Sequence, residues 1–565
     1  MRDKSKVLTF NRSNFLSNVH LYFVPTFFLL LLSFLSFSAK ADWVNLTGAE
    51  TSPNIAEIYV LDDQVKLKLE VYIGDLEKFE ELIPDDWITD PSIKRASLDQ
   101  RIKTFATKRF QFITEDGTKL SAKLELVEPR MRVDRNSAFA GMINPYTKQR
   151  VQAAPDDKRV LYAEISYPFV EKPQQLTIVP PTDERGNAIA SIGFITYHKA
   201  VPVIDFRFLG QSAKLNIDWQ DPWYTKFENK NLTRHHKDPL MVFLYVEPRQ
   251  VRLESLLRLS DITEMTGFQD EGSQGSNKDK HQRLMEHIKN FDADKQALNI
   301  DGKTVKSDSI RVEFLSASLR GLKVIEDSTT VDESSLLVGI SQRVFIESLP
   351  QNIDSQWQYF SQHIDRIPFT ATDPAGPFQG LITKEDPEFG WQNFLKKYQE
   401  PVMQPVIVET GWNIDLPYFG KTKIVNQMPK QEQAISIVDG VLENVRVSYI
   451  EKDPDALSQK LGKVISAKQT IEIETELAKL FSPKVTGGAV GSVQLFNNVD
   501  VIDIRELTKS DGFSATISGV AIISAQHWGH VDQRQISFQL VLDLIEEDTQ
   551  WRLMDLTVVD IKEIK

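Results

Sequence analysis

The sequence predicts a mainly β protein with an α+β C-terminal domain: two tandem β-sandwich-like repeats, then helices followed by a curved sheet. Three observations predict this class. Alternating apolar and polar residues recur between residues 42 and 400, similar segments return at a nearly fixed spacing, and a helical pattern precedes four long strand-like segments at the end. With 565 residues the chain is too long for one hydrophobic core, so several domains are expected.

The first residues are typical of an export signal. A basic start and an apolar stretch over residues 21–37 are followed by Ala39-Lys40-Ala41, the order of a secretory signal peptide cleaved after Ala41. The alternative is an uncleaved membrane anchor, but the apolar stretch is short for a span and Pro25 interrupts it. We expect a signal peptide over residues 1–41, a periplasmic or secreted mature chain, and no membrane span after cleavage.

Composition narrows the function classes. The chain has no cysteine, which excludes disulfides, thiol nucleophiles and cysteine metal sites, and fits a bacterial periplasm. The formal net charge of −13 argues against nucleic acid or an anionic membrane surface as the main partner. With nucleic acid and anionic membranes disfavoured, we expect the partner to be an envelope protein or a small ligand.

A tandem repeat is expected over residues 42–238 and 239–400. Residues 58–67 resemble residues 244–253, and Tyr59 and Tyr245 are separated by 186 positions, as are Gln64 and Gln250. Residues 100–102 and 282–284, then 112–118 and 298–304, match in the same order. The alternative is that unrelated sheets share common strand-turn patterns. A series in one order favours a duplication.

Each repeat is predicted to be a β-sandwich with a helical insertion. Residues 65–73 alternate between apolar and polar, which indicates one buried and one wet face. Asp116-Gly117 and Asp301-Gly302 are hairpin signals, and helical stretches precede them at residues 98–107 and 281–290. The apolar run 240–246 favours a strand covered on both faces. A polar, glycine-containing loop is expected over residues 270–280.

A proline-containing linker is expected over residues 401–430, followed by an α+β domain over residues 431–565. Apolar residues from Ile435 to Tyr449 recur at three- and four-residue steps, which predicts an amphipathic helix. Asp453-Pro454 supplies an N-cap and a first-turn proline for a second helix, and a third is expected near residues 467–480. Strands are predicted over residues 491–507, 513–526, 534–545 and 551–564.

Helices before a long meander, with His527-Trp528-Gly529-His530 and the last strand Trp551-Arg552-Leu553-Met554-Asp555-Leu556, resemble the nuclear transport factor 2-like superfamily of cone-shaped α+β domains. With the stretch 193–248, including Asp205-Phe206-Arg207, the mature chain also resembles an uncharacterised group of exported bacterial proteins. The superfamily includes enzymes, binders and dimerisation modules, so the resemblance implies a cavity or a homodimer interface but selects no function.

The search for chemistry leaves two candidate binding sites. His527 and His530 flank Trp528-Gly529, and a bent strand would let both imidazoles face one cavity as ligands of a transition metal or as acid and base. The alternative is that they cap a turn while Trp528 packs. His235-His236 is expected in a solvated loop, because adjacent side chains on an extended segment diverge.

The second candidate is an aromatic cluster with neighbouring carboxylates, suited to stacking on a ligand or anchoring a partner, or else to packing at a domain end. It comprises Trp219, Trp223, Tyr224 and Phe227. No metalloprotease, serine-hydrolase or phosphate-loop motif is present, and no resident cofactor is expected. We therefore predict an exported interaction or scaffold protein without catalytic activity. The alternative is a metal-handling protein or enzyme that uses the C-terminal cone pocket with His527 and His530.

Overall fold

The structure is a computed structural model that describes residues 47–90, 92–135, 137, 140–144, 148–234, 237–270, 277–318, 321–328, 331–361, 363–416, 420–426, 428–466, 470–485, 490–508 and 512–564. The expected signal peptide lies outside these residues. Strands hold 44% of the chain and helices 21%, so the mainly β prediction is confirmed. Among the described residues, no helix has the length and apolar character to cross a membrane.

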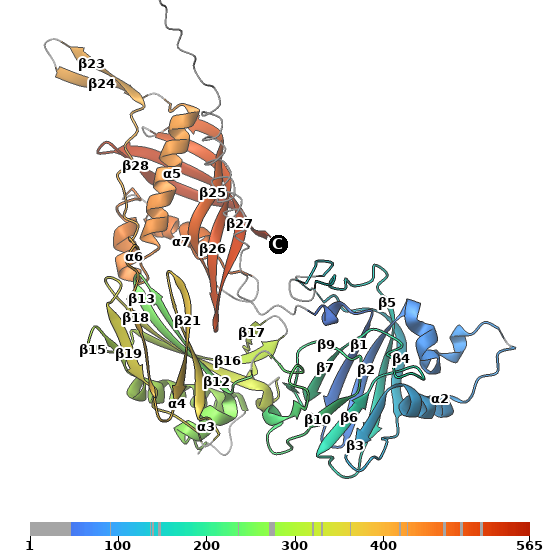
Figure 1. Ribbon diagram of the computed structural model, residues 1–565. Coiled ribbons are helices and arrows are strands. Elements are labelled where there is room, and N and C mark those ends of the chain that lie inside the picture. Colours follow the sequence, from blue (N-terminus) through green and yellow to red (C-terminus); the bar gives the residue numbers. More distant parts are fainter. Residues whose placement is uncertain are drawn as a thin grey trace, which may run out of the picture.

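Residues 47–234, called unit 1 below, form two sheets (Figure 1). The larger has the order β4-β5-β2-β1-β7-β8, in which β1 and β7 run parallel, and the smaller the order β11-β10-β6-β3. The inward residues of β2, Val65, Leu67, Leu69 and Val71, join the core between the sheets, as the alternation predicts. The strands are β1 (Asn54–Val60), β2 (Gln64–Tyr72), β3 (Gln111–Thr114), β4 (Lys123–Met131), β5 (Arg159–Pro168), β6 (Gln175–Val179), β7 (Ile192–His198), β8 (Val201–Pro202), β9 (Arg207–Phe208), which pairs with β7, β10 (Ala213–Asn216) and β11 (Lys226–Phe227).

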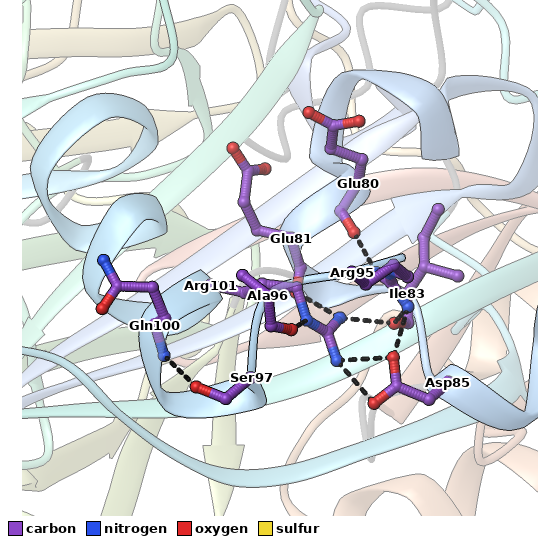
Figure 2. A network of polar contacts seen from close by, with 9 residues as sticks. All are labelled: Glu80, Glu81, Ile83, Asp85, Arg95, Ala96, Ser97, Gln100 and Arg101. Carbon is purple, nitrogen blue, oxygen red and sulfur yellow. Dashed lines mark hydrogen bonds and ion pairs between the residues drawn. The ribbon is translucent and has the colours of Figure 1, made fainter. Parts of the chain in front are cut away.

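A helical insertion between β2 and β3 is held by buried Arg101 (Figure 2). Its guanidinium donates to both carboxylate oxygens of Asp85, at 2.8 and 2.9 Å, and to the carbonyls of Glu81, Ile83 and Ala96. The planar guanidinium of arginine can donate hydrogen bonds to several acceptors at once, which is why one residue holds these segments together. The insertion comprises η2 (Ile73–Leu82), η3 (Asp85–Trp87), α2 (Leu98–Thr104) and η4 (Phe105–Arg109).

Residues 237–392, called unit 2, also form two sheets, with the orders β17-β16-β18-β13-β12-β20-β21 and β15-β14-β19-β22. The run β18-β13-β12-β20 corresponds to β5-β2-β1-β7 of unit 1, and β12 runs parallel to β20 as β1 does to β7. The strands are β12 (Leu240–Glu247), β13 (Gln250–Arg258), β14 (Leu298–Ile300), β15 (Lys303–Val305), β16 (Ser309–Ser318), β17 (Gly321–Val324), β18 (Leu336–Phe345), β19 (Asn352–Gln356), β20 (Arg366–Asp373), β21 (Gly376–Thr383) and β22 (Glu388–Gln392).

Three local sequence predictions in unit 2 can be compared with the structure: a hairpin turn, a loop and a covered strand. Asp301 and Gly302 have φ values of 49° and 74° in a two-residue hairpin that pairs Ile300 with Lys303, as the Asp-Gly signal predicts. Helix α3 (Leu259–Thr266) precedes α4 (Asn277–Lys295). The expected loop over residues 270–280 was wrong at its end, because α4 begins at Asn277. In the apolar run 240–246, Met241 and Phe243 are only half-buried, whereas every residue of β13 is buried.

The C-terminal unit, residues 431–564, has three helices and a four-stranded antiparallel sheet, β25-β26-β27-β28. Asp453 Oδ1 accepts from Ala456 N at 2.9 Å, the predicted N-cap. The segment predicted as a linker also contains a hairpin, β23 (Gly411–Leu416) and β24 (Gly420–Asn426). The other elements are α5 (Gln431–Ser448), α6 (Pro454–Leu461), α7 (Thr470–Phe481), β25 (Val490–Glu506), β26 (Gly512–His527), β27 (His530–Glu547) and β28 (Gln550–Ile564).

Candidate functional site

Trp528 lies where the C-terminal unit meets unit 2. The turn Trp528-Gly529 joins β26 to β27. Together with the last two residues of β26 it is called the hairpin tip (residues 526–529), and it reaches the outer face of the larger sheet of unit 2 (Figure 1). The Trp528 indole is 3% exposed, and its Nε1 donates to Glu313 Oε2 at 2.8 Å. The Gly529 amide donates to Glu254 Oε2 at 3.2 Å. The Gln526 side chain donates to Glu247 Oε1, so the hairpin tip binds this sheet through one buried ring and three carboxylates.

Gly339 of β18 makes room for the indole. A Cβ atom at this position would lie 2.8 Å from two ring carbons of Trp528, closer than real contacts allow. The Arg311 guanidinium lies 4.8 Å from the indole centroid. A glycine under the ring and an arginine over it thus form a socket for one tryptophan.

Trp223 and Tyr224 lie at the contact between units 1 and 2, in η5 (Pro222–Tyr224). Buried Arg258 of unit 2 donates to Asp221 Oδ2 at 2.6 Å and to Asp261, and its guanidinium lies over both aromatic rings. Tyr224 is 37% exposed, whereas Trp223 is buried. Trp223 and Trp528 belong to one apolar cluster, called the junction cluster, with Val201, Leu256, Leu315, Leu322 and Leu337.

Trp219 lies apart from the junction cluster. Its indole Nε1 donates to the Pro173 carbonyl at 2.8 Å, and its ring contacts buried His198, with centroids 4.9 Å apart. Burial lowers the pKa of His198 to about 4, and the neighbouring charge of Lys199 acts in the same direction. The imidazole is therefore neutral at pH 7. The predicted aromatic cluster is divided between the core of unit 1 and the junction.

The backbones of His527 and His530 close the hairpin as a β-pair, but their side chains lie outside what the structure describes. His235 and His236 also lie outside the described residues. Among the described side chains, no group of three or more histidine, aspartate or glutamate residues is placed to hold a metal. The proposed role of His527 and His530 in metal binding stays a prediction.

A Ser–His–Glu chain occurs in unit 2, which is the order of groups in serine hydrolases. The Ser328 hydroxyl lies 2.5 Å from His281 Nδ1, and His281 Nε2 lies 3.2 Å from Glu333 Oε1. Ser328 and His281 are both buried at the start of α4, which leaves no access for a substrate carbonyl. These three hydrogen-bonded side chains therefore fix the loop after β17 to helix α4.

A pocket of about 170 Å³, lined by both charged and apolar side chains, lies on the outer face of the larger sheet of unit 1. Arg135 closes one side: its guanidinium donates to both oxygens of Glu70, at 2.8 and 3.1 Å, and to Glu57 at 3.2 Å. Both carboxylates are thus compensated. The other lining residues are Ile55, Lys68, Arg130, Met131, Val133, Val160 and Tyr162.

Two tyrosines shape the same face. The Arg130 guanidinium stacks 3.8 Å from the centroid of Tyr162, whose hydroxyl donates to Glu164 at 2.7 Å. The Tyr59 hydroxyl donates to Glu57 at 2.9 Å. Burial, with help from these carboxylates, raises the pKa of both phenols well above the usual range. Both hydroxyls remain protonated at neutral pH, so the pocket offers fixed polar groups for recognition.

Lys68 is a lining cation that forms no salt bridge with a described residue, although its charge helps to lower the pKa of Glu164 on the neighbouring strand. Its ammonium lies 4.9 Å from the centroid of Tyr59. The nearby Glu164 is already paired with Lys66 at 2.5 Å. Lys68 therefore presents hydrogen-bond donors to the pocket.

The pocket corresponds in position to the place where the hairpin tip binds unit 2. The offset of 186 residues relates Glu57, Lys68 and Glu70 to Phe243, Glu254 and Leu256. Strand register relates Tyr162, opposite Glu70, to Gly339, opposite Leu256. Sequence reasoning did not find the pocket, although the outward polar positions of residues 64–72 were its visible signal.

No protein-family model matches the chain, and no curated protein matches it. Among solved structures, the crystal structure of the intermembrane space region of chloroplast protein ARC6 aligns with 15% identity and a TM-score of 0.18. The alignment covers 23% of this chain and 98% of that chain. A likeness at this score carries no argument about fold or function.

Proposed function

We propose that the protein is an exported envelope interaction or scaffold protein without catalytic activity, delivered to the periplasm by cleavage after Ala41. We also propose that units 1 and 2 are a duplicated β-sandwich and that the C-terminal unit is a nuclear transport factor 2-like domain. The matched strand orders support the duplication. Three helices before a four-stranded antiparallel sheet support the third assignment.

One observation carries the functional proposal: the hairpin tip fills this place in unit 2, whereas the described residues of unit 1 leave a pocket there beside the loop that carries Arg135. In unit 2 the sheet holds the hairpin tip through Glu254 and Glu313. In unit 1 the equivalent place is a pocket, and Met131 and Val133 beside it are 64% and 60% exposed. Exposed apolar side chains around a pocket with charged side chains are typical of a protein-binding surface.

Site-specific photocrosslinking in cells tests this proposal. A photoreactive amino acid replaces Val133 in the exported chain, and a matched variant carries it at fully exposed Val170 in the same unit. We expect a discrete covalent adduct from position 133 and none from position 170. Equal labelling from both positions, or no adduct from position 133, would contradict the proposal. N-terminal sequencing of the periplasmic protein should begin at Asp42, and an uncleaved chain would contradict the assigned signal.

A further inference from the structure

The internal contact in unit 2 shows what the sheet face can bind. Gly529 of the hairpin tip lies against the side chains of Phe243 and Leu256, because a Cβ built on it would be 3.0 to 3.2 Å from them. Its amide meets the carboxylate of Glu254. A tight turn of the chain thus occupies the position that corresponds to the pocket of unit 1.

Unit 1 already supplies the ring that unit 2 receives from the hairpin tip. Tyr162 stands where unit 2 has Gly339. An arginine stacks on the ring in each unit, Arg130 on Tyr162 and Arg311 on Trp528, although the two arginines come from different register positions. A visiting segment therefore needs no tryptophan.

The polarity of the contact is reversed between the units. Where unit 2 offers the carboxylate of Glu254 to an N–H donor, unit 1 offers the ammonium of Lys68. Glu57 and Glu70 both form hydrogen bonds with the single charge of Arg135, and with Lys68 and Arg130 the charged lining residues still carry more positive than negative charge. The complementary group on a visiting turn is an acceptor, and a carboxylate forms the stronger hydrogen bond with an ammonium.

We propose that the pocket of unit 1 binds an acidic turn of a partner protein, in which a carboxylate meets Lys68 beside a small residue, and a flanking apolar side chain covers Met131 and Val133. This inference rests on the proposed function and names the chemistry of the partner.

Defined hairpin peptides test the proposal on the mature chain, residues 42–565. Three fluorescent, disulfide-closed hairpins differ only in the turn (Asp-Gly, Asn-Gly or Lys-Gly) and carry leucines beside it, and fluorescence anisotropy measures their affinities. We expect the Asp-Gly hairpin to bind about tenfold more tightly than the Asn-Gly hairpin, the effect of one charge-assisted hydrogen bond. In the Lys68→Glu variant, the preference should pass to the Lys-Gly hairpin.

The matched control is Lys123→Glu, which makes the same charge change at a residue of β4 that is 73% exposed and outside the pocket lining. It should leave all three affinities within about twofold, since an exposed charge at this separation is screened. The proposal is overturned if the acidic and amide hairpins bind equally, if Lys68→Glu leaves the preference unchanged, or if no hairpin binds. The crosslink at position 133 separates the two proposals. An adduct that persists in Lys68→Glu keeps the interaction function and rejects the acidic turn, whereas the absence of an adduct when Lys68 is unchanged rejects the function itself.

Discussion

Replacing Trp528 with alanine should release the C-terminal unit from unit 2 while both units stay folded. A buried tryptophan removes roughly 150–250 Å² from water, equivalent to about 4–6 kcal/mol of transfer free energy. The hydrogen bond to Glu313 adds little, because that carboxylate is 27% exposed and water can replace the indole donor. Allowing for relaxation at the junction, we expect a loss of about 3–5 kcal/mol of docking free energy.

Hydrogen exchange measured by mass spectrometry reports this loss directly. In Trp528→Ala, exchange should rise in the hairpin tip and in β13 and β18 beneath it, while the core of the C-terminal sheet stays protected. The control is Trp551→Ala, because Trp551 is equally buried but lies in the core of the C-terminal unit, where its indole Nε1 donates to the Val408 carbonyl at 3.0 Å. That variant should lower protection throughout the C-terminal unit.

The reasoning is refuted if Trp528→Ala leaves exchange in β13 and β18 unchanged, because the indole would then contribute nothing to docking. It is also refuted if Trp528→Ala and Trp551→Ala give the same exchange pattern, because Trp528 would then act as an internal core residue of its own unit.

Three further predictions concern packing and charge. Gly339→Ala places a Cβ 2.8 Å from the Trp528 ring, so it should weaken docking by about 1–3 kcal/mol in the same exchange assay, and unchanged exchange would contradict the socket. Arg258→Ala breaks a buried ion pair with Asp261 and should reduce stability by about 3 kcal/mol in denaturant melts, with faster proteolysis between units 1 and 2; an unchanged melt would reject this role. Burial raises the pKa of Asp292 to about 6, so its folded form binds a proton more tightly than its unfolded form, and the stabilisation present below pH 4 is lost as pH rises through 6. Relative to Asp292→Asn, wild type should therefore lose up to about 3 kcal/mol of unfolding free energy between pH 4 and pH 7 in parallel melts, and a pH-independent difference would contradict this assignment.

Sequence patterns predicted the elements whose causes are local. The Asp301-Gly302 turn and the Asp453 N-cap follow from backbone conformations and hydrogen bonds within a few residues. Alternation along residues 65–73 predicted which side chains enter the core of unit 1. Alternation alone does not describe β13, where the outward Arg252 and Glu254 are buried as well. The turn at Gly529, more than 270 residues later in the chain, covers part of the outer face of β13.

By itself, the sequence predicted that this chain is mainly β, where the helices and long strands of the C-terminal unit lie, and that two segments share one spacing. Tertiary structure alone decided which outer sheet face the hairpin tip covers and which one holds a pocket. The physical reason is that side-chain period and turn chemistry act over a few residues, whereas the socket needs Gly339, Glu254 and Trp528 from three distant strands and turns. The pocket of unit 1 likewise depends on Arg135 reaching from a loop to Glu57 and Glu70.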